Sequence, residues 1–251
     1  MVDPVAFNIP WLGHPVYWYG ILVALGFVAA LTHWSATAQR VGMPKGVASD
    51  LAFIVMFGGI LGARALYVAA DWAYFSANPI EIIRIDRGGL VFYGGFLAAA
   101  IAVVVMARIR DIPVLKLGDF TVSALPLGHA FGRIGCLLNG CCYGSTCDLP
   151  WAVYTAGAMR HPVQAYEALF NLLLYLVLLR VLLKGGRNGW IIAIYLIGYS
   201  AWRFTIEFWR GDERLPAAFG LDAAQNLSLA LFAVGMIMAI VLILRDRRRS
   251  S

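Results

Sequence analysis

Charged residues are scarce in this sequence. Only 14% of its 251 residues are Asp, Glu, Lys or Arg, whereas 61% are hydrophobic, and the mean hydropathy is +0.75. A soluble domain carries about 25% charged residues. The composition therefore excludes an ordinary soluble protein and predicts an all-α, polytopic membrane protein.

Several sequence signals are missing as well. The chain has no P-loop, no dinucleotide-binding fingerprint and no zinc-protease helix. Those absences exclude the corresponding enzyme classes, and we expect neither a cofactor nor a metal. The segment from Met1 to Pro15 has no basic region of the kind that begins a signal peptide. We therefore expect the first helix to stay in the mature protein.

Long apolar runs, by contrast, are abundant. A membrane-spanning helix needs about 20 mainly apolar residues. The runs predict seven spans in a single transmembrane domain, residues 1–251, with a basic tail at 245–251. The predicted spans cover residues 17–36, 48–70, 88–107, 118–139, 164–183, 189–209 and 222–244.

Lysine and arginine are unevenly distributed among the predicted loops. The excess lies at or after the ends of the first, third, fifth and seventh spans, at Arg40, Lys45, Arg108, Arg110, Lys116, Arg180, Lys184, Arg187, Arg245 and Arg247 to Arg249. Cytoplasmic loops keep such an excess. We therefore predict an outer N-terminus and a cytoplasmic C-terminus, and the net charge of +6 requires no nucleic-acid partner.

Among the charged residues in or next to the apolar spans, we single out five near the outer ends of their helices: Arg64, Arg133, Arg203, Glu207 and Arg210. A charge at membrane depth is costly unless it is paired or faces water. One interpretation is structural, with an i,i+4 pair between Arg203 and Glu207 and with Arg210 reaching the interface. The other is a pocket for an anion such as a phospholipid phosphate, because four arginines face one glutamate.

All four cysteines lie between residues 136 and 147, with the spacing C-x4-CC-x4-C. On the predicted topology they face the oxidising side, where thiols tend to pair. Structural disulfides involving Cys136 or Cys147, free and partly buried thiols, and a metal site are all compatible with this spacing, which is not that of a zinc ribbon. A further hypothesis is that one cysteine carries a transient thioether or thioester.

Six blocks occur along the chain in a fixed order. They read "YWYG", "GARALY", "GGLVFYGGF", "GRIG..LNG..YG", "HPVQAYE" and "GYSAWRFTIEFWR". Together they cover nearly the whole chain, and they resemble the bacterial prolipoprotein diacylglyceryl transferase family. The resemblance implies a seven-helix protein of the bacterial cytoplasmic (inner) membrane, with its active site facing the outer side.

The reaction implied by the resemblance moves the diacylglyceryl group of phosphatidylglycerol to a thiol. The acceptor is the lipobox cysteine in the signal peptide of a prolipoprotein, and the products are a thioether and glycerol phosphate. A thiolate attacks carbon while a phosphate leaves, so the site needs cationic donors and a proton acceptor. The alternatives are a related transferase with another acceptor and a non-catalytic phospholipid-binding paralogue.

The resemblance also assigns roles to residues. It implies catalytic roles for Arg133, Arg203, Tyr93, Tyr199 and Tyr19, and substrate-binding roles for Arg64, Asn139, Gly144, His161, Gln164, Glu207 and Arg210. Three positions depart from the better-known members: Tyr93 replaces a histidine, Cys136 an asparagine and Cys141 a glutamate. Histidine titrates near neutral pH and tyrosine does not, so Tyr93 is expected to be a poor general base.

Overall fold

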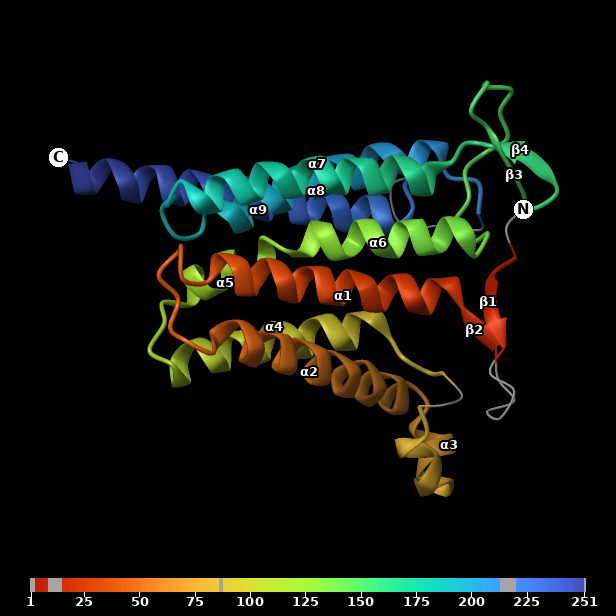
Figure 1. Cartoon of the computed structure of the whole chain (residues 1–251), viewed down its shortest axis with the longest axis horizontal. Coiled ribbons are helices and arrows are strands. Elements are labelled where there is room, and N and C mark those ends of the chain that lie inside the picture. Colours follow the sequence, from red (N-terminus) through yellow and green to blue (C-terminus); the bar gives the residue numbers. More distant parts are fainter. Residues whose placement is uncertain (1–2, 9–14, 86–87, 213–219, 251) are drawn as a thin grey trace. The chain divides into compact units, whose positions relative to one another are not determined.

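The computed structural model describes residues 3–8, 15–85, 88–212 and 220–250 (Figure 1). Helices dominate these residues. By its internal contacts the chain divides into two compact units, of which unit 1 holds residues 1–34 and 122–251 and unit 2 holds residues 35–121. The single domain expected from the sequence stays a prediction.

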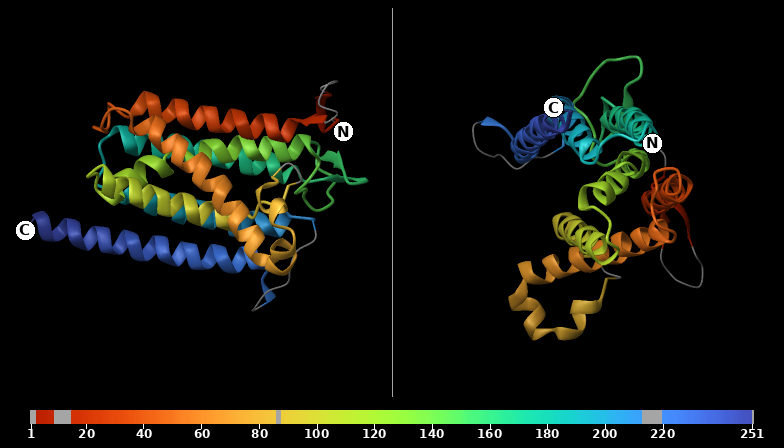
Figure 2. Two further views of the ribbon diagram at one scale, coloured as in Figure 1. Left: turned by 90° about the horizontal axis from the view of Figure 1, so that it is seen from below. Right: turned by 90° about the vertical axis from the view of Figure 1, so that its left-hand side faces the viewer.

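Unit 1 contains two small antiparallel sheets and most of the long helices. The sheets pair β1 (Val5–Asn8) with β2 (Pro15–Tyr17), and β3 (Val153–Thr155) with β4 (Ala158–Arg160). The helices are α1 (Trp18–Thr37), α6 (Leu125–Leu138), α7 (Val163–Leu183), α8 (Trp190–Ile206), η2 (Glu207–Trp209) and α9 (Ala223–Ser250). Helix α7 packs against α6 and α8, and α8 packs against α9. Figure 2 shows the axes of the long helices of this unit roughly aligned with one another.

Unit 2 is built around one helix pair. Its elements are α2 (Val47–Ala70), α3 (Trp72–Ala77), η1 (Pro79–Ile83), α4 (Phe92–Ile109) and α5 (Val114–Val122). Helices α2 and α4 pack so closely that a Cβ atom on Gly94 would overlap the carbonyl oxygen of Gly62, and one on Gly95 would lie 2.7 Å from that of Gly59. Glycine is therefore required where these two helices cross.

Six of the described helices are long and apolar enough to cross a membrane: α1, α2, α4, α7, α8 with η2, and α9. Their limits agree with six of the predicted spans to within a few residues. Large apolar side chains on them are exposed, among them Phe53, Leu61, Leu169 and Ile237, each by about 60% or more. Such side chains suit a lipid-facing surface, and the chain is accordingly a polytopic helical membrane protein.

The predicted span at residues 118–139 is different in the structure. It is divided between α5 and α6, with Pro126 in the first turn of α6. Proline has no amide hydrogen and disfavours helical geometry in the residue before it, which explains the interruption. Helix α6 has 14 residues, so it is about 21 Å long, whereas a bilayer core is about 30 Å thick. One continuous helix over these residues was therefore the wrong prediction, whereas a membrane crossing by this segment stays a prediction.

The interruption places a polar group inside unit 1. His33 of α1 lies 2.8 Å from the Ser123 hydroxyl through Nε2 and 3.1 Å from the Tyr175 hydroxyl through Nδ1. Ser123 is one of the residues between α5 and α6, and it is fully buried. Both ring nitrogens of His33 therefore have partners inside unit 1.

Candidate active site

A buried ion pair joins α6 to α7 in unit 1. Arg133 Nε lies 3.1 Å from Glu167 Oε2, and the two side chains are 14% and 1% exposed. Within the described part of the chain neither carboxylate oxygen of Glu167 accepts a hydrogen bond, so the contact with Arg133 is electrostatic rather than an aligned hydrogen bond. Glu167 was not among the predicted site residues.

Two further arginines approach from the end of α8. Arg203 pairs with Glu207, as one interpretation of the sequence predicted. Arg210 contacts Asp212, with Nε 2.9 Å from Oδ1, and it lies 4.0 Å from Glu207. The Arg210 side chain is 9% exposed and lies among these carboxylates.

The charges of this cluster are balanced. The cations are Arg133, Arg203 and Arg210, and the anions are Glu167, Glu207 and Asp212. The sequence had suggested unpaired positive charge, because Glu167 and Asp212 were not counted against the arginines. All three guanidinium groups act electrostatically on the Glu167 carboxylate. Each guanidinium has five N–H donors, so one carboxylate partner does not use them all.

Two predicted tyrosines flank the cluster. Tyr199 of α8 interacts with the Arg133 guanidinium, and its ring lies 5.2 Å from that of His129. Tyr19 of α1 lies against Gly135 of α6, where a Cβ atom would be 3.1 Å from its ring. Both hydroxyl-bearing side chains therefore belong to the same site as Arg133.

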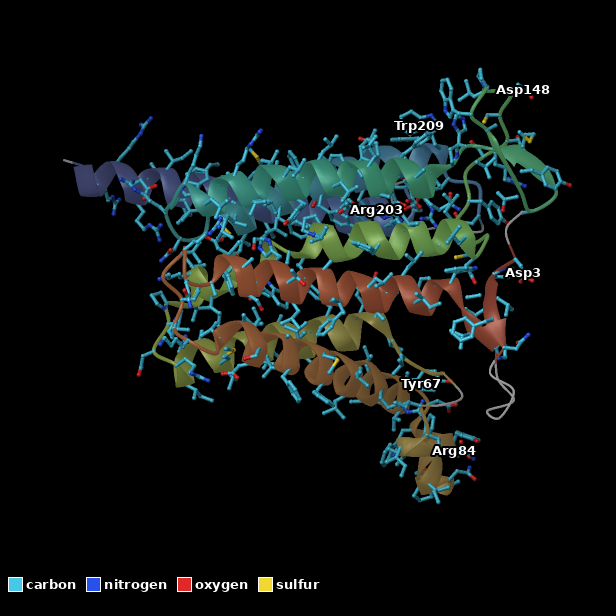
Figure 3. The ribbon with its side chains drawn as sticks, in the orientation of Figure 1. Asp3, Tyr67, Arg84, Asp148, Arg203 and Trp209 are labelled. Atoms are coloured by element: carbon cyan, nitrogen blue, oxygen red, sulfur yellow. The ribbon has the colours of Figure 1, made fainter. Side chains whose placement is uncertain are left out.

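The loop after α6 is held by main-chain hydrogen bonds. Gly144 donates its amide to the His161 carbonyl at 3.2 Å, and Ser145 donates to the Trp209 carbonyl at 2.8 Å. A Cβ atom on Gly144 would overlap the His161 carbonyl oxygen and lie 3.0 Å from that of Trp209. Three separate segments therefore meet at Gly144. Figure 3 shows Trp209 at the end of unit 1 where β3 and β4 lie, with Arg203 deeper along α8.

Side chains reinforce the same loop. Gln164 donates through Nε2 to the Cys141 carbonyl at 2.7 Å, and Arg160 donates to the Gly144 carbonyl at 3.2 Å while its guanidinium covers the Tyr143 ring at 4.7 Å. Asn139 caps α6. Gln164 therefore supports this loop beside the cluster. Arg160 supports it as well, although it was not among the predicted site residues.

His161 contributes mainly through its backbone. Its amide donates to the Ser145 carbonyl at 3.0 Å, and its carbonyl receives the Gly144 amide. Its ring lies 6.3 Å from that of Tyr166, and its Nδ1 has no hydrogen-bond partner within the described residues. The structure thus places His161 at the loop rather than against the arginines.

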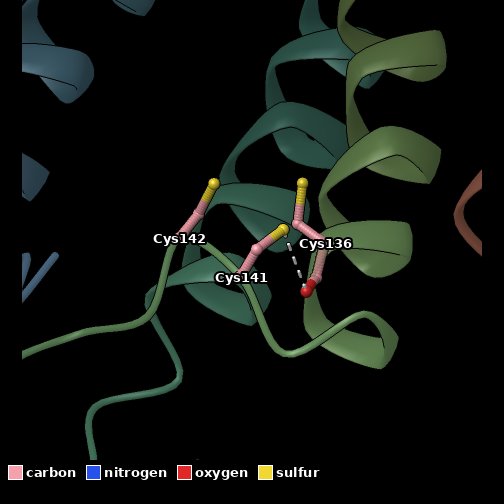
Figure 4. A group of neighbouring side chains, drawn as sticks. All are labelled: Cys136, Cys141 and Cys142. Carbon is pink, nitrogen blue, oxygen red and sulfur yellow. Dashed lines mark hydrogen bonds between the residues drawn. The ribbon is translucent and has the colours of Figure 1, made fainter. Parts of the chain in front are cut away.

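Three of the four cysteines converge beside this cluster (Figure 4). The Sγ atoms of Cys136, Cys141 and Cys142 all lie within 4.8 Å of one another. All four cysteines are free, so the disulfides considered from the sequence are not formed. A hydrogen bond with Cys136 and the charges of Arg210 and Arg133 lower the pKa of the Cys142 thiol to about 5.

Arg64 and Tyr93 belong to unit 2. The Arg64 guanidinium donates to four main-chain carbonyls: Glu81 at 2.5 Å, Ile82 at 2.9 Å, Gly88 at 3.0 Å and Gly89 at 3.1 Å. It also lies 5.3 Å from the ring centres of Tyr67 and Phe75. Arg64 therefore holds the segment after α3 in place. Its hydrogen bonds are with main-chain carbonyls, whereas the sequence predicted that it binds an anion. Tyr93 is 63% exposed in the first turn of α4.

The segment that Arg64 fixes also borders a cavity. This segment includes η1, in which Ile80 and Ile83 are more than 70% exposed. Asp86 and Arg87 lie outside the described residues, as do Glu213 and Arg214. The cavity has about 540 Å³ and mostly apolar walls, formed among others by Ile60, Leu61, Val68, Trp72 and Ile85.

The fold and the site together define a class of protein, namely a multi-pass membrane protein with a buried arginine–carboxylate cluster. The family model described as prolipoprotein diacylglyceryl transferase matches residues 4–241. Proteins named phosphatidylglycerol–prolipoprotein diacylglyceryl transferase are similar to this chain. The one from Pseudoalteromonas translucida is 37% identical, covering 94% of this chain and 91% of its own length.

Two further relatives of the same name agree. That of Finegoldia magna is 36% identical and covers 95% of each chain, and that of Clostridioides difficile is 31% identical and covers 100% of this chain and 99% of its own. The chain therefore belongs to the prolipoprotein diacylglyceryl transferase family. The family predicted from the six sequence blocks is confirmed.

Proposed function

We propose that this protein transfers the diacylglyceryl group of phosphatidylglycerol to the lipobox cysteine of prolipoproteins, at the outer face of the bacterial cytoplasmic membrane. Family membership supports the activity. The observation that carries its assignment to a site is the cluster of Arg133, Arg203 and Arg210 around the buried Glu167 carboxylate. Guanidinium groups in a site shielded from water suit a phosphodiester substrate.

The proposed reaction is a displacement at carbon. The sulfur of the acceptor thiolate attacks the glycerol carbon that bears the phosphate ester, the carbon–oxygen bond breaks, and its electron pair leaves with the oxygen of glycerol phosphate. Negative charge grows on that oxygen in the transition state. Arginine N–H groups not used by the carboxylates would stabilise it, with Tyr199 as a neighbouring hydroxyl donor.

Glu167 serves this chemistry by positioning. Removing the charge of a buried arginine's partner leaves that arginine without compensation. A fully buried carboxylate next to Arg133 therefore keeps the guanidinium in place and prevents the cluster from having a large net charge before the lipid binds. Arg64 is left out of the phosphate-binding set, because main-chain carbonyls occupy its donors.

The test is direct. Purified protein is incubated with labelled phosphatidylglycerol and a lipobox peptide, and the thioether peptide is detected by mass spectrometry. We expect product with the unchanged protein and a loss of at least about a hundredfold with Arg133→Ala. Arg187→Ala is the matched control, since Arg187 is 55% exposed in its pair with Asp246. Equal rates for the unchanged protein and Arg133→Ala would overturn the assignment of the site.

A second candidate is a transferase of the same lipid group to another acceptor. Tyr93 in place of a histidine, together with Cys136 and Cys141, favours this alternative, because the proton acceptor of the reaction is altered. Binding of phosphatidylglycerol without formation of the peptide thioether would support it.

A further inference from the structure

The three-cysteine group is built by the fold of the loop. Cys136 lies in the last turn of α6, and Gly140 with φ +70° turns the chain back on the helix. Cys142 holds φ +59°, a left-handed conformation that non-glycine residues rarely adopt. Bonds from Cys141 N to the Cys136 carbonyl and from Gln164 to the Cys141 carbonyl keep this shape. The thiols are thus brought together by a constrained loop.

The spacing of the sulfur atoms suits a metal ion. Zinc binds thiolates at about 2.3 Å in tetrahedral geometry, which places the sulfurs about 3.8 Å apart. The three Sγ atoms already lie within 4.8 Å of one another, so each pair is within about 1 Å of this spacing. No other His, Cys, Asp or Glu ligand atom of the described residues joins this group. Three protein ligands leave the fourth position of a tetrahedral ion open, as in catalytic zinc sites.

The surrounding charges suit such a complex. A divalent ion bound by three thiolates carries a net charge of about −1. Arg133 acts electrostatically on both Cys136 and Cys142, and Arg210 acts on Cys142. These two guanidinium groups would compensate the excess negative charge.

We propose that Cys136, Cys141 and Cys142 bind a thiophilic divalent cation of the Zn²⁺ type, and that its open position receives the acceptor thiol. This inference rests on the proposed function and deepens it. A thiol that coordinates such an ion loses its proton. The metal-bound sulfur then forms the bond to the glycerol carbon as glycerol phosphate leaves, and the neutral thioether, a weaker ligand, dissociates. The thiol proton passes to water, so the reaction does not require a histidine at position 93.

The proposal departs from the sequence-based expectation of no metal. The spacing C-x4-CC-x4-C gives no sign that Cys136 meets the adjacent pair, because the meeting depends on the turn at Gly140. The proposed metal site gives a function to Cys136 and Cys141, two of the positions that differ from the better-known members.

Metal binding is measured first, without reference to activity. Full-length protein is treated with a chelator and titrated with Co²⁺ as the spectroscopic probe. We expect thiolate-to-cobalt charge-transfer absorption, the visible bands of tetrahedral cobalt, and equimolar zinc by elemental analysis when Zn²⁺ is supplied. Cys136→Ser and Cys141→Ser should each weaken binding by at least about tenfold, the loss that even a change beside a metal ligand typically causes. Cys147→Ser, outside the group, is the matched control.

The open position is tested with the acceptor. A lipobox peptide should shift the cobalt spectrum, and the same peptide with serine in place of its cysteine should leave the spectrum unchanged. Thermal unfolding of each variant in detergent identifies one that has simply failed to fold. Absence of thiolate-to-cobalt absorption in the folded, reduced protein would overturn the proposal.

The two proposals fail separately. If metal-free protein and a folded Cys136→Ser/Cys141→Ser variant form thioether peptide at the normal rate, the transferase activity stands and the metal proposal is overturned. Alternatively, the cysteine peptide shifts the cobalt spectrum, with no shift from the serine peptide and no thioether formed. That outcome supports the metal site with its open position and contradicts the proposed activity.

Discussion

At the scale of single residues, the site depends on a carboxylate that the sequence analysis passed over. Glu167 is the fourth residue of the predicted span 164–183, so the rule that selected Arg133 and Arg203 would also have selected it. The arginines were found because each interrupts an apolar run. The partners of Arg64 could not be found in this way, since they are main-chain carbonyls that any sequence provides.

Glu167→Gln tests the positioning role. We expect kcat to fall about a hundredfold, because a small displacement of a reacting or stabilising group has that effect. The KM for phosphatidylglycerol should stay the same or fall, since the cluster gains positive charge. Steady-state kinetics in detergent separate the two constants, and Glu167→Asp should restore part of kcat. A raised KM with unchanged kcat would contradict the role.

Arg64→Ala tests the anchoring of the segment after α3. Hydrogen bonds from a charged donor contribute about 1.5–3 kcal/mol each, and Arg64 makes four such bonds. We expect local opening to become easier by at least about 2 kcal/mol, measured as faster amide hydrogen exchange in η1. Arg84→Ala is the control, since Arg84 is half-exposed and lies 3.5 Å from Glu81. Unchanged exchange in Arg64→Ala would contradict the anchoring role.

At the scale of helices and strands, the sequence predicted the helices whose formation depends mainly on the length of an apolar run. Six predicted spans agree with helices because a run of about 20 apolar residues has few alternatives in a membrane. The helix over residues 118–139 is interrupted just before Pro126, because the missing amide hydrogen of proline outweighs the hydropathy of the run. The loop after α6 depends on bonds to residues 161, 164 and 209, which lie far away in the sequence and leave no local pattern.

Gly94→Ala tests the crossing of α2 and α4. The added methyl group would overlap the Gly62 carbonyl, so we expect the protein to lose about 1–3 kcal/mol of stability. Gly58→Ala is the matched change on α2, because its Cβ would lie in ordinary contact, 3.6 Å from Ala102. That variant should be neutral or up to about 1 kcal/mol more stable. Thermal unfolding in detergent compares the two, and equal stability would contradict the close crossing.

At the scale of the whole molecule, the distribution of Lys and Arg predicts the orientation in the membrane. A fluorescent protein fused after Ser251 should fluoresce in living bacteria, because the C-terminus is predicted to be cytoplasmic. Alkaline phosphatase fused within the hairpin of β3 and β4 should be active, since that loop is predicted to lie outside. A fluorescent C-terminus combined with an inactive phosphatase fusion would contradict the predicted side of the site.

The meeting of three segments at Gly144 has a consequence for how this site can be altered. The loop, the hairpin and the end of α8 are joined mainly through main-chain amides and carbonyls, which every amino acid except proline supplies. Replacing the side chain at position 136 or 141 therefore leaves these main-chain bonds in place. A protein engineer could therefore introduce a different group to activate the nucleophile in this membrane protein, because the backbone that supports the site does not depend on those side chains.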